Sequence, residues 1–279
     1  MPSKEEIVGL IPAAGEGTRL YPFSRAVPKE MYPILGKAVI EHAVENLREA
    51  GIEKIFIIVG HQKGSIMDYI GDGSFFGVKV SYLYQMKRKG LGHAVLQAKE
   101  WIDTTFTVLL GDSFIEPKNE AKNLIKIHEK ERPLATILLF KVKDPTTYGI
   151  AKIKDMKDHY GTITDLIEKP TLKQAISYKV NGDYYAICGM YVFEPEIFGY
   201  IEKTKPDKKG EIQLTDAIMN AIKNGEKVMG VVLRGAYMDI GKWQTVLNVE
   251  KYMLKMNRLG NIIREREKVM RNVMKLNKR

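Results

Sequence analysis

The sequence predicts an α/β protein with a mostly parallel central sheet flanked by helices. Apolar runs typical of buried strands alternate with segments of helical periodicity through the first half of the chain. The first run, residues 7–11, leads directly into a turn that contains Gly15 and Gly17, as expected where a buried strand ends in a loop. The chain has 279 residues, of which 44% are hydrophobic, so we expect a sizeable core.

The first half contains the clearest alternation. Val39, Ala43 and Leu47 share one stripe of a helix that ends at Gly51. Residues 78–84 alternate between apolar and more polar side chains, which predicts a strand covered on one face. Taken in order, we expect helices over residues 38–50, 62–70, 91–102 and 118–131, and strands over residues 7–11, 55–59, 78–84, 106–110 and 134–142.

The second half changes character after Gly149. Short strands and turns replace the regular alternation, and no linker composition marks a domain edge. We therefore expect an inserted β portion, at about residues 143–205, within one catalytic domain of residues 1–241. A helical tail, residues 242–279, then packs on the domain or forms a subunit contact. The expected strands are 150–154, 162–168, 184–193, 228–233 and 237–241, with a helix over 213–223.

The turn after the first strand has the features of an anion-binding loop. Gly15 and Gly17 let a ligand approach the main chain, and successive N–H groups in such a loop attract anions. Arg19 adds a permanent cation suited to phosphate. Two glycines alone would equally fit an ordinary strand-to-helix turn. The dinucleotide-binding pattern needs a third Gly or Ala where this chain has Leu20. The Walker pattern needs Gly-Lys-Ser/Thr where this chain has Gly17-Thr18-Arg19.

A second cation, Lys29, stands between Pro28 and Pro33, which stiffen its segment. With residues 14–20 and Pro22, this segment resembles the opening motif of the sugar-1-phosphate nucleotidylyltransferases. That motif runs Ala/Gly-Gly-x-Gly-Thr-Arg-Leu, then Pro, then Pro-Lys ten residues after the Arg. The resemblance recurs to about residue 241, and it implies a Rossmann-like nucleotidyltransferase fold.

The resemblance implies a Mg²⁺ site at two aspartates. Asp112 follows the strand 106–110, and Asp239 ends an apolar run just before a glycine. A single Asp after a strand is more often a helix cap. Two carboxylates from distant segments, completed by phosphate oxygens and water, make a sound Mg²⁺ site. The Leu-Gly-Asp and Asp-x-Gly positions that hold the metal in the family correspond to Asp112 and Asp239.

The resemblance also implies roles for residues that contact the two substrates. Arg19 would hold the leaving pyrophosphate, Lys29 would stabilise charge near the α-phosphate, and Lys169 would anchor the attacking phosphate. Glu168 would contact sugar hydroxyls. Gln85, five residues before Gly90, matches the base-reading element, and its amide suits the O4 and N3–H edge of uracil or thymine. The expected nucleotide-binding residues are Ala13, Ala14, Gly15, Gly17, Thr18, Gln85 and Gly90, and the expected sugar-phosphate residues are Gly149, Glu168, Lys169 and Gly189.

Composition excludes several other classes of protein. The formal charge of +10 suits a polyanionic substrate, a nucleic acid or a solvated surface. The excess positive charge, however, lies in the expected substrate loops and in the tail. We therefore expect no nucleic-acid partner. No apolar run reaches transmembrane length and no secretory leader is evident, so we expect no membrane partner. The one cysteine, Cys188, excludes an internal disulfide and suits the cytoplasm.

The preferred nucleotide stays open between two pyrimidines. Residues 28–31 and 90–95 resemble bacterial uridylyltransferases, whereas the compact chain and residues 237–243 resemble the thymidylyl branch. We expect a UTP–glucose-1-phosphate uridylyltransferase with Mg²⁺, which forms a dimer or tetramer. The alternatives are a glucose-1-phosphate thymidylyltransferase that uses dTTP, dual use of both nucleotides, or a non-catalytic sugar-nucleotide sensor.

Overall fold

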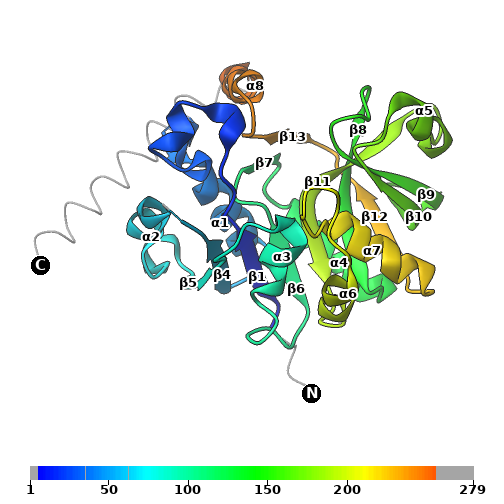
Figure 1. The fold of residues 1–279 in the computed structure, drawn as a ribbon, viewed down its shortest axis with the longest axis horizontal. Helices are drawn as coiled ribbons and strands as arrows, with labels where there is room; N and C mark the ends of the chain where they lie inside the picture. Colours follow the sequence, from blue (N-terminus) through cyan, green and yellow to red (C-terminus); the bar gives the residue numbers. More distant parts are fainter. Residues whose placement is uncertain (1–5, 35, 62, 256–279) are drawn as a thin grey trace, which may run out of the picture.

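The computed structural model describes residues 6–34, 36–61 and 63–255. Its centre is a nine-stranded sheet in the order β5-β4-β1-β6-β11-β8-β12-β10-β9, which Figure 1 shows with helices on both sides. The strands of this sheet are β1 (Val8–Pro12), β4 (Lys54–Val59), β5 (Lys79–Tyr84), β6 (Phe106–Leu109), β8 (Ala135–Val142), β9 (Gly149–Lys157), β10 (Tyr160–Glu168), β11 (Tyr184–Phe193) and β12 (Val228–Val232).

The sheet is mostly parallel, as the sequence predicts. β1 pairs in parallel with β4 and β6, β4 with β5, and β8 with β12. Only β11 and β10 run against their neighbours. The other strands (β5, β4, β1, β6, β8, β12 and β9) therefore share one direction, and the carboxyl ends of β1, β4, β5 and β6 meet at one edge.

Helices cover the sheet in two layers, and alternate side chains of each strand enter different cores. Leu10 packs in the core beneath α3, α6 and α7, whereas Ile11 packs in the core beneath α1, α2 and α4. Strands buried on both faces in this way are typical of α/β sheets. The helices are α1 (Val39–Glu49), α2 (Gly64–Ile70), α3 (Gly90–Leu96), α4 (Glu120–Glu131), α5 (Leu172–Ala175), α6 (Ile197–Lys203), α7 (Leu214–Lys223) and α8 (Trp243–Lys255).

Most predicted elements are present, with two informative differences. The helix predicted to reach residue 102 ends at Leu96, because the chain then tightens into turns in which Gln97 and Ala98 bond to residues three positions earlier. The strand β7 (Ser113–Glu116) was not predicted, because residues 113–116 directly follow Asp112 and read as a loop. It forms a two-stranded sheet with β13 (Ala236–Asp239).

The predicted inserted portion, residues 143–205, has no sheet of its own. β9 and β10 extend the central sheet at one edge, and β11 lies in its interior between β6 and β8. The pairing of Met190 with Leu109 places this portion beside the strand that leads to Asp112. The β portion and the first half of the chain therefore share one continuous sheet.

The first part of the predicted tail packs on the domain. Val246, Val249 and Met253 of α8 are buried against Leu20, Ile34 and Ile240, above the edge where β13 lies (Figure 1). The tail residues predicted at helical spacing beyond α8, namely Met256, Val269, Val273 and Leu276, lie outside the described residues. Among the described residues, no helix combines the length and the hydropathy needed to cross a bilayer.

Candidate active site

A cavity of about 800 Å³ opens at the carboxyl ends of the parallel strands. This is where ligands bind in open α/β sheets. Every site residue predicted from the sequence lines this cavity, with the exception of Ala13. Ala13 is 1% exposed, and its N–H donates to the carbonyl of Ile58 at 2.8 Å. Ala13 therefore extends the pairing of β1 with β4, and its predicted contact with the nucleotide stays a prediction.

The glycine-rich loop lies at the end of β1. Gly17 has a left-handed backbone (φ +71°) and begins the 3-10 turn η1 (Thr18–Leu20), and the Ser24 hydroxyl donates to its carbonyl at 2.7 Å. A Cβ on Gly15 would stand 3.5 Å from the Nζ of Lys29. The loop thus presents its main chain beside the Lys29 ammonium, as a phosphate-binding loop requires.

The two predicted metal-binding carboxylates come together through the β7–β13 pairing. Asp239 lies opposite Ser113, and the Ile240 N–H donates to the Asp112 carbonyl at 2.8 Å. Burial and the nearby Asp112 charge raise the pKa of Asp239, against the opposing charge of Arg19. Two carboxylates that repel each other in this way favour a shared cation.

Lys29 lies beside this acidic pair and forms an ion pair with Asp112. Burial would raise the pKa of Asp112, but the Lys29 ammonium outweighs burial and lowers that pKa. Burial would likewise lower the pKa of Lys29, but the carboxylates of Asp112 and Glu30 outweigh it and raise that pKa. Both groups are therefore charged at neutral pH, and Lys29 can serve a phosphate without a proton being moved first.

The donor set fits Mg²⁺. Asp112 and Asp239 supply oxygen ligands, and the described residues contain no group of three or more carboxylate, imidazole or thiol side chains that could enclose an ion. Mg²⁺ is usually held by one or two carboxylates together with substrate phosphates and water. These two aspartates would hold the ion, which would supply neutralisation of phosphate charge.

Gln85 lies directly after β5, at another part of the cavity wall. Its side chain is buried, and its Nε2 donates to the Gly90 carbonyl at 3.2 Å and contacts His93 Nδ1 at 3.0 Å. The acceptor at Gly90 fixes which end of the amide is nitrogen. Gly90 has φ +92°, and a Cβ there would stand 2.7 Å from the carbonyl of Ile212, so only glycine fits. Gln85 is thus held in place at the cavity wall.

The far wall of the cavity is formed by the β9–β10 pair. Glu168 lies opposite Gly149, and a Cβ on Gly149 would stand 3.0 Å from Glu168 Oε2. The Thr215 hydroxyl donates to the same Oε2 at 2.9 Å, while Lys169 Nζ lies 3.0 Å from Oε1. Lys169 is 61% exposed, so its ammonium can move toward a ligand at low cost.

Sequence reasoning missed several residues at this cavity. Thr215 is the second residue of α7, and its hydroxyl bonds Glu168. A Cβ on Gly241 would stand 2.7 Å from both Arg19 Nη2 and Asp239 Oδ2, so the glycine of the Asp-x-Gly motif makes room for this pair. Glu30 lines the cavity and forms a buried ion pair with Lys63. Apart from that glycine, none carries a local sequence signal, because each depends on a partner distant in the chain.

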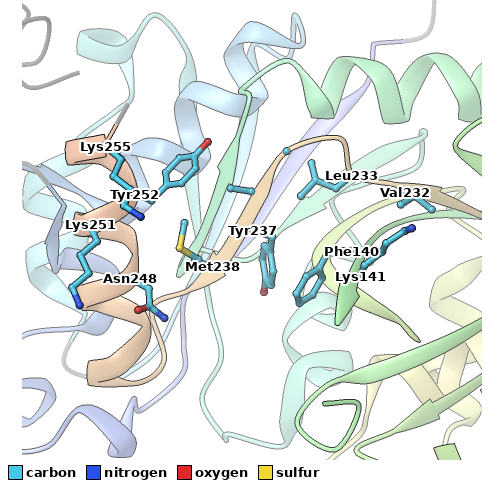
Figure 2. Close-up of a pocket in the computed structure, with 12 residues that line it drawn as sticks. Phe140, Lys141, Val232, Leu233, Tyr237, Met238, Asn248, Lys251, Tyr252 and Lys255 are labelled. Atoms are coloured by element: carbon cyan, nitrogen blue, oxygen red, sulfur yellow. The ribbon is translucent and has the colours of Figure 1, made fainter. Parts of the chain in front are cut away.

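A second cavity, of about 750 Å³, lies between β13 and α8 (Figure 2). The rings of Phe140 and Tyr237 lie against each other there, with centroids 4.7 Å apart. Asn248, Lys251 and Tyr252 approach it from α8. Tyr237 lines both cavities, so β13 separates them. None of the predicted site residues lines this second cavity.

The family comparison agrees with this geometry. Residues 8–256 match the family described as nucleotidyl transferase, which includes nearly all of the described chain. The chain belongs to the nucleotidyl transferase family. The match extends from β1 through the end of α8, so the inserted β strands and the first tail helix are parts of the nucleotidyl transferase unit.

Named members of the nucleotidyl transferase family are similar over most of this chain. The low-salt glycan biosynthesis nucleotidyltransferase Agl11 of Haloferax volcanii is 36% identical over 248 residues, covering 88% of this chain and 66% of Agl11. A glucose-1-phosphate thymidylyltransferase of Streptomyces griseus is 31% identical over 268 residues, covering 95% of this chain and 72% of the relative. This chain spans only about half the length of some other curated relatives.

Solved structures agree in fold and in extent. A UDP-glucose pyrophosphorylase complexed with UDP-glucose superposes with a TM-score of 0.80 and 29% identity, covering 90% of this chain and 99% of that chain. The mixed sheet described above is therefore a Rossmann-like nucleotidyltransferase fold, as the sequence predicts.

Proposed function

We propose that this protein is a UTP–glucose-1-phosphate uridylyltransferase, which makes UDP-glucose and pyrophosphate. One observation carries this proposal. The glycine-rich loop, Lys29, the Asp112–Asp239 pair, Gln85 and the Glu168–Lys169 pair all line a single cavity. That cavity therefore has groups suited to a base, to a triphosphate and to a sugar phosphate, so both substrates could bind in it side by side.

The reaction is a direct displacement at the α-phosphorus of the nucleotide. A phosphate oxygen of the sugar phosphate attacks in line, a new P–O bond forms, and the bond to the leaving pyrophosphate breaks. Such chemistry depends mainly on positioning and on neutralising charge. Arg19 and the N–H groups of residues 15–18 hold the leaving pyrophosphate, and Lys29 stabilises charge at the α-phosphate. Lys169 leaves Glu168 to anchor the attacking phosphate.

The two aspartates provide a site for a Mg²⁺ ion that would complete the charge balance. Asp112 and Asp239 would hold the ion, and the bound ion would neutralise phosphate charge. Lys29 now pairs with Asp112, and the arriving phosphates provide it with a second set of anionic partners. Glu168, held by Thr215, accepts hydrogen bonds from sugar hydroxyls beside Gly149.

The buried amide of Gln85 supports a pyrimidine with an N3–H group. Because Nε2 already donates to Gly90, the carbonyl oxygen Oε1 is the atom through which the amide can accept from a ligand. Uracil and thymine both offer an N3–H donor, whereas cytosine has an acceptor at N3. The Gln85 geometry therefore favours UTP and dTTP over CTP.

The second candidate is a glucose-1-phosphate thymidylyltransferase. It is supported by the similarity to the Streptomyces griseus enzyme of that name over 95% of this chain. A methyl-sized difference between the two bases is worth only about 1–3 kcal/mol of discrimination. Dual use of UTP and dTTP is therefore compatible with the same site.

We further propose that the protein acts in the cytoplasm as a dimer or tetramer. Cys188 is the only cysteine in the chain and is fully buried, which suits a reducing compartment. The expected assembly rests on the family resemblance, and light scattering of the full chain tests it, since a monomer at working concentration would refute it.

Pyrophosphate release tests the proposed reaction. The assay contains Mg²⁺ with UTP, dTTP, ATP, GTP or CTP, each combined with glucose 1-phosphate, galactose 1-phosphate or N-acetylglucosamine 1-phosphate. We expect release with UTP and glucose 1-phosphate to be fastest, and the UTP to dTTP ratio decides between the two candidates. Binding of sugar nucleotides without release from any pair would instead support the sensor.

A further inference from the structure

A buried ion pair lies directly behind the catalytic lysine. Glu30 and Lys63 are joined by a 2.8 Å contact between Oε2 and Nζ, and their side chains are 1% and 5% exposed. Glu30 belongs to the 3-10 turn η3 (Lys29–Met31), and Lys63 immediately precedes α2. Two charges so deeply buried are costly to keep in a fold unless each has its partner.

The position of Glu30 makes this pair relevant to the reaction. Its Cγ lies 3.3 Å from where a Cβ on Gly111 would stand, so its stem runs beside the segment that carries Asp112. Glu30 is also the sequence neighbour of Lys29, and its charge acts on the Lys29 ammonium. Lys29 is therefore close to two carboxylates, Asp112 and Glu30, and it pairs with Asp112.

Lys63 explains why Lys29 pairs with Asp112. An ammonium in a low-dielectric interior moves toward the least compensated negative charge. Glu30 already has Lys63 as an ion-pair partner at 2.8 Å, whereas Asp112 has the second carboxylate, Asp239, nearby. Without Lys63, Glu30 would be an unpaired buried anion, and Lys29 would be the cation best placed to neutralise it.

We propose that Lys63 is a positioning residue, which neutralises Glu30 so that the Lys29 ammonium stays with Asp112 and the reacting phosphate. This inference rests on the role of Lys29 in the proposed function. Lys63 does not line the active-site cavity. Its effect passes through Glu30, so removing both charges together does less harm than removing the lysine alone.

A set of four variants tests the proposal by pyrophosphate release with the preferred nucleotide and sugar phosphate. Lys63→Met is expected to lower kcat about 100-fold, the scale of a displaced catalytic group, while KM for the nucleotide changes less. Lys63→Arg keeps the charge and should retain most of kcat. The double variant Glu30→Met/Lys63→Met should recover at least about tenfold of the loss, because coupled residues are not additive.

Lys118→Met is the matched control. It also breaks a partly buried ion pair, between Lys118 and Glu45, but neither residue lines the active-site cavity. It should lower the unfolding temperature without changing kcat. If Lys63→Met does not fold, the kcat of the double variant still tests the proposal, because apolar replacements of a buried pair are usually tolerated.

The outcomes separate this inference from the proposed function. No pyrophosphate release from the wild-type protein with any substrate pair would overturn both. An active wild type with an unaffected Lys63→Met, or a double variant as impaired as Lys63→Met, would overturn the inference alone. A fall in kcat of the folded Lys63→Met protein, measured well below its unfolding temperature and reversed by the second substitution, would support it.

Discussion

At the scale of single residues, three cations that line the cavity are each paired with a carboxylate. Lys29 contacts Asp112, and Lys169 contacts Glu168. Arg88, which follows β5, likewise contacts Glu16 of the glycine-rich loop. Both proposed substrates are polyanions, so their binding would exchange these carboxylates for phosphates. We infer that the cost of the exchange is greatest at Lys29, since that pair is the most buried of the three.

Lys29→Met tests the most buried of these cations. We expect kcat to fall about 100- to 1000-fold, the usual effect of removing one preorganised charge-stabilising group. The rate of pyrophosphate release measures this fall in kcat. Lys54→Met is the control, because Lys54 pairs with Glu6 at the surface, where both side chains are about half exposed. A Lys29→Met protein with near-normal turnover would refute the assigned role.

Gln85→Ala tests base recognition. The substitution removes the amide that would meet N3–H, so we expect kcat/KM for UTP and dTTP to fall about 10- to 100-fold, with little change for ATP. Gln97→Ala is matched to it, because the Gln97 amide bonds the His93 carbonyl but does not line the cavity. Equal losses with all five nucleotides would mean that Gln85 supports the loop and does not read the base.

At the scale of elements, the proposed sugar end of the cavity depends on the close approach of β9 and β10. Gly149→Ala would add a Cβ 2.9 Å from Ile187 Cδ1 and 3.0 Å from Glu168 Oε2. We expect KM for the sugar phosphate to rise about tenfold, with a smaller change for the nucleotide. Gly199→Ala, where no atom lies within 4 Å of the added Cβ, should leave both values unchanged. Equal changes in both KM values would contradict this assignment of the sugar end.

Helix α1 contains a histidine that links stability to pH. His42 is buried, its ring packs edge-on against Phe114, and its Nε2 has no hydrogen-bond partner among the described residues. Burial, the largest effect, lowers the pKa of His42 from 6.5 to about 4. The unfolded chain therefore takes up a proton first as the pH falls. The stability from a neutral His42 is complete above pH 6.5 and is lost as the pH falls toward 4.

Urea unfolding measures this linkage. The loss should reach about 3 kcal/mol at the acidic end of the window, since each pKa unit corresponds to about 1.4 kcal/mol. His42→Phe keeps a ring beside Phe114 and removes the titration, so its stability should depend less on pH over this window. Parallel pH profiles for the two proteins would show that other groups cause the loss.

At the scale of the whole molecule, metal and nucleotide should act together on stability. A ligand at 100 times its Kd stabilises a protein by about 2.7 kcal/mol, which for a chain of this size raises Tm by about 5–10 °C. We expect Mg²⁺ with UTP to produce such a shift and EDTA to remove most of it. In Asp239→Asn, UTP with and without Mg²⁺ should give nearly the same Tm. A full metal-dependent shift in that variant would place the ion elsewhere.

The sequence by itself determined the class of fold and predicted most of the residues that line the candidate site. Local patterns were sufficient for the fold, because buried strands appear as apolar runs and helices as apolar stripes with a period of 3.6 residues. The glycine-rich loop and Asp112 each follow a strand of the α/β sheet, and the resemblance to the family implied the roles of Lys29 and Asp112. All of them line one cavity. Ala13 does not line it, and a small residue beside the loop gives no sign in the sequence of which way its backbone faces.

Tertiary structure alone decided which groups meet. Residues 143–205 read as an insertion, yet β11 lies inside the central sheet, because strand order depends on packing across long sequence separations. The Glu30–Lys63 pair, the Thr215–Glu168 bond and the approach of Arg19 to Gly241 each join distant segments. No periodic pattern in the sequence predicts such contacts. The free energy by which they stabilise the fold depends on burial and charge compensation, which arise only once the chain has folded.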